Sequence, residues 1–414
     1  MIPFISLLAF YVAWNLGAND VANSMGTSVG SKAVTLRQAL IIAGILEFTG
    51  AVLFGRGVSK TLVTGIVNPA LFVTTPQVFL VGMVAVLLAC GLCLQLATAL
   101  GLPVSSSHAI VGAIAGFATL AMGPQAVNWH SIGLISLTWV ITPILSGTIA
   151  ALFYSLLRHW ILQHPNPIAQ LYEWIPWLSA STCGIFGIIV FPTFAKTPPI
   201  AALPLPPQDG LILLGLGSVV ALTFLGWHAL DAATRQAEPP IPVATTLQAQ
   251  LSRYQLVSAC LVAFAHGSND VGNAIAPLAA IVYIHTTGTV PLVDFTIPLW
   301  IFYLGGAGIV AGLAVWGKNV IATIGTGIMP LLPSSGFCAE LATATTVLLA
   351  SRAGLPVSTS HALVGSVVGI GLLQDWRSVQ FGSLRQITIA WLCTIPLAAG
   401  LGAAIFAGIQ FFLT

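Results

Sequence analysis

Long apolar runs make up most of the chain, and short polar or proline-bearing stretches separate them. A helix needs about 20 apolar residues to cross the hydrocarbon core of a bilayer, and runs near this length recur from one end of the sequence to the other. They occupy residues 1–27, 38–57, 77–100, 103–122, 131–157, 176–195, 210–228, 254–284, 296–316, 336–350, 356–373 and 386–412. The pattern predicts an all-α polytopic membrane protein with about 12 transmembrane helices.

The composition excludes the soluble classes of protein. Hydrophobic residues make up 57% of the 414 residues and charged residues only 5%, and the mean hydropathy is +0.99. Soluble domains carry about 25% charged residues, so neither a soluble enzyme nor a disordered chain fits. The net charge of +2 is too small to attract nucleic acid, and the partner that the composition implies is the lipid bilayer.

Two sequence motifs occur twice. Gly17–Asn23 (GANDVAN) recurs as Gly267–Asn273 (GSNDVGN), with five of seven positions identical. Gly101–Gly112 (GLPVSSSHAIVG) recurs as Gly354–Gly365 (GLPVSTSHALVG), with ten of twelve positions identical. Because order and spacing also persist, the two halves are a duplication.

The longest polar interruption, residues 229–253, separates the two copies. We expect a first repeat over 1–157, connecting helices and a polar central link over 158–253, and a second repeat over 254–414. The first loop after the GANDVAN motif contains Lys32 and Arg37, whereas residues 285–296 contain no Lys or Arg. Since short cytoplasmic loops are rich in basic residues, we expect inverted-topology repeats with both termini external. The shortness of the link favours a bacterial inner membrane.

Asp20 and Asp270 are ionisable residues within apolar runs, at equivalent positions of the two copies. A charge at membrane depth costs several kcal/mol unless it is paired, so such residues indicate function, the alternative being a carboxylate bonded to nearby backbone. Asparagines flank both aspartates at Asn19, Asn23, Asn269 and Asn273. Glycines in both motifs would let broken helices unwind at the membrane midplane, and free carbonyls beside Asp and Asn oxygens make a site for a hard cation such as sodium.

The second duplicated motif places a run of hydroxyl residues directly after a Leu-Pro pair. The hydroxyl residues are Ser105, Ser106 and Ser107 in the first copy and Ser358, Thr359 and Ser360 in the second. Proline interrupts the preceding helix, so these residues occupy the cap and first turn of the next one. Free amides, hydroxyls and the positive helix end favour an oxyanion there, although simple capping gives the same pattern. Anion and cation sites together predict a pocket at the midplane.

Phosphate suits such a pocket better than sulfate. An ionised carboxylate repels a fully deprotonated anion but accepts a hydrogen bond from one that retains a proton. Phosphate retains at least one proton near neutral pH, whereas sulfate retains none. Two aspartates beside the anion therefore favour phosphate, unless bound cations neutralise both of them.

Glu47 and Glu340 are further acidic residues within apolar runs. Each is a candidate cation ligand or gate, and the alternative is a structural pair with Arg56, Lys60 or Lys318.

Three histidines lie close to the motifs. His108 and His361 each follow a hydroxyl triplet, and we expect them to pack or orient helices rather than to shuttle protons. His266 has no repeat partner because position 16 is Leu, so we expect it to be incidental. The sequence contains no GxSxG, HExxH, Walker or dinucleotide-binding motif, so we expect neither an enzyme nor an organic cofactor.

The segments GANDVANSMGTSVGSKAVTLRQA and HGSNDVGNAIAPLAA, with the two GLPVS(S/T)SHA(I/L)VG segments, resemble the inorganic phosphate transporter family, the PiT permeases. The resemblance covers the chain apart from its central link. It implies inverted repeats, external termini, a homodimer, and uptake of phosphate in symport with a cation, sodium being favoured over the proton. Motif by motif, it implies an anion site of Asp20, Asp270, Ser105, Ser106, Ser358 and Thr359. It implies cation ligands at Asn19, Asn23, Asn269 and Asn273.

Other functions stay open at this point. The same family contains sulfate permeases. An uncoupled anion channel would need no paired Asp and Asn motifs, and a membrane phosphotransferase would need a nucleophile that the sequence lacks. A phosphate sensor would need a signalling domain or a long charged tail. The interpretation that fits most residues is a secondary transporter that imports phosphate by alternating access.

Overall fold

The computed structural model describes residues 1–100, 104–194, 207–235, 242–292, 295–324 and 328–413. Within these ranges the protein folds into thirteen α-helices, and no β-strand occurs apart from an isolated bridge between Val67 and Val127. The all-helical membrane fold predicted from the apolar runs is therefore confirmed.

Each of the twelve predicted runs coincides with a helix, and α3 is an additional short one. The helices of the N-terminal part are α1 (Ile2–Gly30), α2 (Leu36–Phe54), α3 (Arg56–Thr64), α4 (Pro76–Ala99), α5 (Ser106–Met122), α6 (Trp129–Leu157), α7 (Pro167–Phe194) and α9 (Pro207–Arg235). Those of the C-terminal part are α10 (Val243–Thr287), α11 (Leu299–Ile324), α12 (Pro333–Arg352), α13 (Thr359–Gln374) and α14 (Phe381–Leu413).

Eight of the described helices are long and apolar enough to cross a membrane, and α5 and α13 are shorter apolar helices of 17 and 16 residues. Helix α5 packs beside α4, and α13 packs beside α12. The residues at the start of each short helix are buried, so each hydroxyl motif lies at a break inside the helical body. The break before α13 contains Leu355 and Pro356, as expected for a proline that cannot continue a helix, whereas Pro103 lies outside the described residues.

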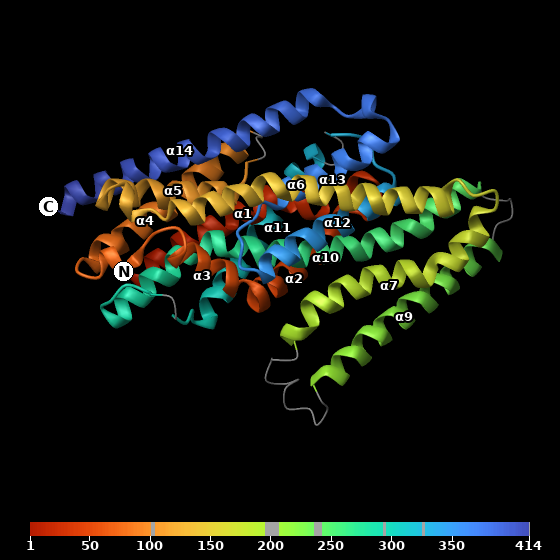
Figure 1. The fold of residues 1–414 in the computed structure, drawn as a ribbon, viewed down its shortest axis with the longest axis horizontal. Coiled ribbons are helices and arrows are strands. Elements are labelled where there is room, and N and C mark those ends of the chain that lie inside the picture. Colours follow the sequence, from red (N-terminus) through yellow and green to blue (C-terminus); the bar gives the residue numbers. More distant parts are fainter. Residues whose placement is uncertain (101–103, 195–206, 236–241, 293–294, 325–327, 414) are drawn as a thin grey trace.

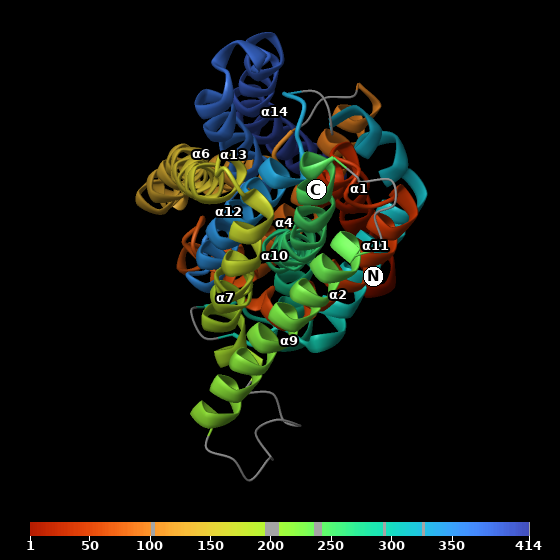
Figure 2. The ribbon, with the colours of Figure 1, turned by 90° about the vertical axis from the view of Figure 1, so that its right-hand side faces the viewer.

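The helices run mainly along the long axis of the molecule, and both chain termini lie at the same end of it (Figure 1). Helices α7 and α9 form a pair that extends from one side of the bundle, as the end-on view shows (Figure 2). The two parts of the chain interleave. Helix α1 packs on α11, α2 on α10, α5 on α14 and α6 on α13, so each of these pairs joins one copy of the duplication to the other.

The predicted unwinding at the motif glycines is wrong. Helices α1 and α10 run without interruption through Asp20 and Asp270. The glycines instead allow close packing of backbones: a Cβ at Gly17 would lie 2.7 Å from the carbonyl carbon of Ile309, and one at Gly267 would lie 2.6 Å from that of Glu47. Glycine is required here for the approach of a second helix rather than for backbone freedom.

The predicted central link is also shorter than expected. Helix α9 continues to Arg235 and α10 begins at Val243, so most of residues 229–253 are helical. Prolines at 239, 240 and 242 punctuate the sequence between these helices, and the polar residues that follow belong to the first turns of α10. The polar residues therefore belong largely to helix ends rather than to a connecting loop.

Candidate functional site

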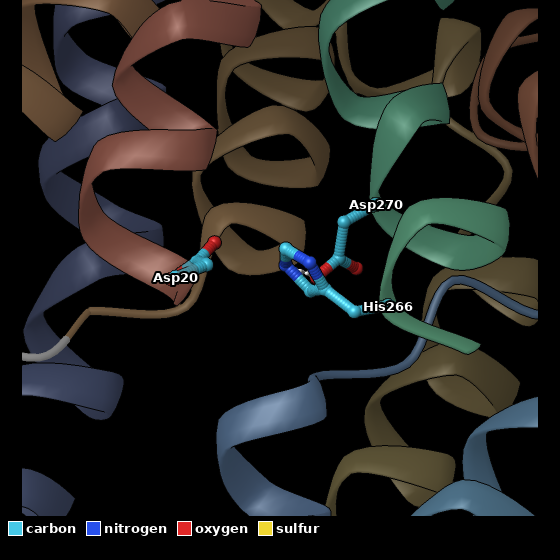
Figure 3. A group of neighbouring side chains, drawn as sticks. All are labelled: Asp20, His266 and Asp270. Atoms are coloured by element: carbon cyan, nitrogen blue, oxygen red, sulfur yellow. Dashed lines mark ion pairs between the residues drawn. The ribbon is translucent and has the colours of Figure 1, made fainter. Parts of the chain in front are cut away.

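Two carboxylates and an imidazole meet in the interior, where α1 lies against α10 (Figure 3). Asp20 comes from α1, and His266 and Asp270 come from α10. One ligand atom of each residue lies within 4.8 Å of the other two, and all three residues are at most 2% exposed. The structure therefore brings together the two aspartates that the sequence placed in separate motifs.

His266 bridges two carboxylates. Its Nδ1 lies 3.1 Å from Glu47 Oε1, and its Nε2 lies 2.9 Å from Asp270 Oδ2. Ionised carboxylates only accept hydrogen bonds, so both ring nitrogens must carry protons when both contacts are hydrogen bonds to ionised groups. The expectation that His266 is incidental is wrong. The sequence feature that indicates its role is its spacing of four residues from Asp270, which places both side chains on one face of a helix.

Glu47 connects α2 to this cluster. Its Oε1 accepts a hydrogen bond of 2.8 Å from Ser24 on α1, in addition to its contact with His266. The ion-pair partner of Glu47 is therefore His266 rather than Arg56 or Lys60. Glu47 thus lies one side chain away from Asp270, and its role as a cation ligand or gate stays a prediction.

The first turns of α5 and α13 meet the cluster through hydrogen bonds to α10. Thr359 donates to Asp270 Oδ2 at 3.2 Å. Asn273 donates to Ser106 at 3.2 Å and to Ser107 at 3.1 Å. Ser106 also lies beside the Asp20 carboxylate. Four of the six predicted anion-site residues thus lie in one buried group: Asp20, Asp270, Ser106 and Thr359.

The other two predicted anion-site residues act as helix caps. Ser105 accepts a hydrogen bond from the backbone amide of His108 at 3.3 Å, and Ser358 accepts one from the amide of His361 at 3.4 Å. Both serines are buried. Their oxygens satisfy amides in the first turn, which fixes the starts of α5 and α13 beside the cluster.

The four predicted asparagines divide into two pairs. We call the buried cluster around Asp20, Glu47, His266 and Asp270 the central group. Asn23 donates to Asp20 Oδ1 at 3.3 Å, so it belongs to this group together with Asn273. Asn19 donates to Thr98 at 2.9 Å, and Asn269 donates to Ser351 at 3.0 Å, each bonding the helix that precedes a hydroxyl motif. These last two bonds join equivalent positions of the duplicated sequence.

Glu340 lies in a separate polar cluster. Its carboxylate accepts hydrogen bonds of 2.6–3.1 Å from the side chains of Thr27, Ser28, Gln255 and Ser258. Thr27 follows Asp20 by seven residues, which corresponds to roughly 10 Å along α1. The structure does not bring Glu340 into the central group. The predicted alternative, a pair with Lys318, falls on a side chain outside the described residues.

Three buried oxygens of the central group have no hydrogen-bond donor among the described residues. They are Glu47 Oε2, Asp270 Oδ1 and Asn273 Oδ1. A buried acceptor without a donor is unfavourable, so such atoms call for a ligand. Carboxylate and amide oxygens are the ligands that hard cations prefer, and these three therefore fit a cation.

A membrane-embedded helical protein that gathers charged and hydroxyl groups in its buried centre has the features of a solute transporter. The chain matches the phosphate transporter family over residues 16–402. It is 38% identical over 401 residues to a Haemophilus influenzae protein named as a phosphate permease, an alignment that covers 97% of this chain and 94% of that protein. It is also 38% identical to the chloroplastic inorganic phosphate transporter 2-1 of Arabidopsis thaliana, over 95% of this chain and 70% of that protein.

A solved structure described as the sodium-dependent phosphate transporter matches this one with a TM-score of 0.89 and 36% sequence identity, covering 99% of each chain. The chain belongs to the phosphate transporter family. The members of the family and the structural neighbour are transporters, not enzymes, so the prediction of a non-enzymatic phosphate transport protein is confirmed.

Proposed function

We propose that the protein imports inorganic phosphate in symport with sodium, by alternating access. The observation that carries this proposal is the buried group of Asp20, Glu47, His266 and Asp270 beside the first turns of α5 and α13. Thr359 at the start of α13 donates to Asp270 Oδ2, and Ser106 at the start of α5 lies beside Asp20. Glu47 Oε2 and Asp270 Oδ1 have no donor among the described residues. Donors for an anion and acceptors for cations thus lie within reach of one another.

The charge balance of the group favours coupling over a channel. Three carboxylates and one imidazole leave a negative net charge even when the ring of His266 is fully protonated. A carboxylate about 5 Å from an anionic phosphate costs roughly 3 kcal/mol at an effective dielectric constant of about 20. Cations that enter together with phosphate remove this repulsion, whereas an uncoupled channel has nothing to offset it.

The chemistry of the acceptors favours sodium as the coupling cation. Glu47 Oε2 and Asn273 Oδ1 are hard oxygens without a donor among the described residues, and sodium prefers ligands of this kind. The structural neighbour is named as sodium-dependent, which supports the same ion. A proton gradient is the alternative driving force, since the same carboxylates also accept protons.

The aspartates also favour phosphate over sulfate. Thr359 donates to Asp270 Oδ2, whereas Asp270 Oδ1 has no donor among the described residues. Oδ1 can therefore accept a hydrogen bond from a protonated oxyanion. Phosphate retains a proton near neutral pH and donates it to such an oxygen, whereas sulfate has none to donate.

We further propose that the two copies have opposite topology and rock against each other around this group. Equivalent hydrogen bonds join Asn19 to Thr98 and Asn269 to Ser351, and helices of one copy pack against helices of the other in matching pairs. Both support a pseudo-symmetric arrangement of the kind that produces alternating access. The basic loops support external termini, and the family resemblance leads us to expect a homodimer in a bacterial inner membrane.

Uptake into proteoliposomes tests the proposal. Radioactive phosphate uptake is measured under an inward sodium gradient, an equal potassium gradient, and an inward proton gradient, each with and without excess unlabelled sulfate. Sodium-dependent uptake that sulfate does not inhibit is the expected result. Uptake driven by a proton gradient would mean that the coupling ion is the proton rather than sodium. Inhibition by sulfate would mean that the site also accepts sulfate. Equal uptake under every condition would show an uncoupled channel.

A pair of variants links the result to the central group. Asp270→Asn removes the charge beside Thr359 and His266, and we expect it to abolish sodium-driven uptake. Asp231→Asn makes the same chemical change at a carboxylate that is 45% exposed on α9, and we expect it to transport like the wild type. Equal uptake by both variants would show that the Asp270 carboxylate is not needed for transport.

A further inference from the structure

Two histidines and two tryptophans form a buried cluster next to the hydroxyl motifs at the starts of α5 and α13. The ring of His108 lies on that of Trp139 with centroids 3.9 Å apart, and the ring of His361 lies on that of Trp391 at 3.7 Å. The two imidazoles lie edge to face at 4.8 Å, and each is 4% exposed. The cluster therefore joins the first turns of α5 and α13 to the middle of α6 and α14.

Hydrogen bonds cross between the two halves of this cluster. His108 Nδ1 lies 3.0 Å from the backbone oxygen of Trp391, and His361 Nδ1 lies 3.0 Å from that of Trp139. A carbonyl oxygen only accepts, so Nδ1 carries the proton on each ring. Each histidine thus packs at a tilt against the ring of one tryptophan and donates to the backbone of the other. In addition, the indole of Trp139 donates to the carbonyl of Pro356 at 3.1 Å, just before α13.

A proline explains why one of these bonds is needed. Pro143 lies inside α6, four residues after Trp139, and proline has no amide hydrogen to donate to the carbonyl four residues earlier. An unpaired carbonyl within a membrane-spanning helix is costly, and His361 supplies the missing donor. On α14, the residue four positions after Trp391 is Ile395, which retains its amide. The bond from His361 is therefore the more important of the two.

We propose that His361, and to a lesser degree His108, are positioning residues for phosphate. Through Nδ1 they hold the first turns of α13 and α5, and with them the hydroxyls of Thr359 and Ser106, in fixed register across the two copies. The Ser107 hydroxyl, which donates to the carbonyl of Val357 at 2.8 Å, adds a second link of the same kind. The inference rests on the proposed phosphate site at these two helix starts.

Substitution of His361 by asparagine or glutamine tests which ring nitrogen matters. Asparagine places an amide nitrogen near the position of Nδ1, and glutamine places one near that of Nε2. We expect His361→Asn to keep the half-saturating phosphate concentration within about threefold of wild type, and His361→Gln to raise it about tenfold or more, with a smaller change in maximal rate. Both values come from uptake into proteoliposomes, with phosphate binding to the purified protein as a second readout.

A double-mutant cycle tests the role assigned to the proline. Pro143→Ala returns an amide hydrogen to α6, so the Trp139 carbonyl regains a helical partner and depends less on His361. We expect His361→Ala to raise the half-saturating concentration about tenfold in the wild-type background and about threefold or less in the Pro143→Ala background. Equal effects in both backgrounds would overturn the proposal.

Other outcomes are equally decisive. Recovery by glutamine but not by asparagine would assign the function to Nε2, and equal behaviour of all His361 variants and wild type would refute a positioning role. The wild-type control keeps the two proposals apart: if wild type takes up no phosphate under any gradient, the proposed function fails, whereas normal wild-type uptake with insensitive variants refutes only this inference.

Discussion

Replacing Gly267 by alanine tests whether close helix packing holds the central group together. The added Cβ would lie 2.6 Å from both the carbonyl carbon and the Cα of Glu47, while ordinary contact begins at 3.4 Å. The carbonyl oxygen of Glu47 lies closer still to this Cβ, so helices α10 and α2 must part by more than 0.8 Å, the difference between these two distances. The same movement lengthens the contact between His266 and Glu47 from 3.1 Å to about 3.9 Å, beyond hydrogen-bond range.

We estimate the cost from these two effects. Overpacking of a well-packed interior costs about 1–3 kcal/mol, and loss of a hydrogen bond to a charged group costs about 1.5–3 kcal/mol. We expect Gly267→Ala to lower the apparent Tm of the purified protein by on the order of 5 °C, and to reduce sodium-driven phosphate uptake by about tenfold or more.

A matched glycine on α9 provides the control. A Cβ at Gly217 meets no atom within 4 Å, so Gly217→Ala adds only the helix propensity of alanine and should leave Tm and uptake unchanged or slightly raised. Thermal unfolding and uptake are measured on both variants in parallel. If Gly267→Ala matches Gly217→Ala in both assays, the backbones do not meet at Gly267 as described, and the reasoning fails.

Three further substitutions follow from individual contacts. His266→Gln removes the bridge between two carboxylates, and uptake should fall about tenfold or more while the exposed His130→Gln has no effect; equal uptake by the two would exclude the bridge from transport. Thr359→Val removes one donor at constant shape, so the half-saturating phosphate concentration should rise about threefold to tenfold at a similar maximal rate, and an unchanged concentration would mean that this hydroxyl does not face phosphate. Glu340→Gln replaces one of the two acceptor oxygens by an NH2 group, which is a donor facing other donors, so the variant should have a lower Tm than the exposed control Glu173→Gln. Matching Tm values in thermal unfolding would refute the hydrogen-bonded cluster.

The helices and the two aspartates were predictable because each depends on local sequence. A run of about 20 apolar residues specifies a membrane helix whatever its neighbours are. An ionisable residue within such a run is unfavourable in any fold that leaves it unpaired, so Asp20 and Asp270 stand out without a structure. Their equivalence in the duplicated motifs then led to the expectation of a shared site, and the structure places them together.

The features that the sequence did not reveal depend on partners far along the chain. Gly267 suits both an unwound helix and a close helix contact, and the choice depends on Glu47 of a different helix. His266 was expected to be incidental because the first copy has Leu16 in its place, and the sequence does not show that Glu47 of another helix is its second partner. The carbonyl that His361 pairs with belongs to Trp139, which is 222 residues away. No local pattern reports such pairings.

Simultaneous measurement of radioactive sodium and radioactive phosphate in the same proteoliposomes tests the central claim most directly. The account predicts that each solute requires the other for uptake, that the two enter in a constant ratio as either concentration is varied, and that Asp20→Asn abolishes both fluxes together. Phosphate entry without accompanying sodium, or sodium entry that ignores phosphate, would contradict coupling at the buried group of Asp20, Glu47, His266 and Asp270.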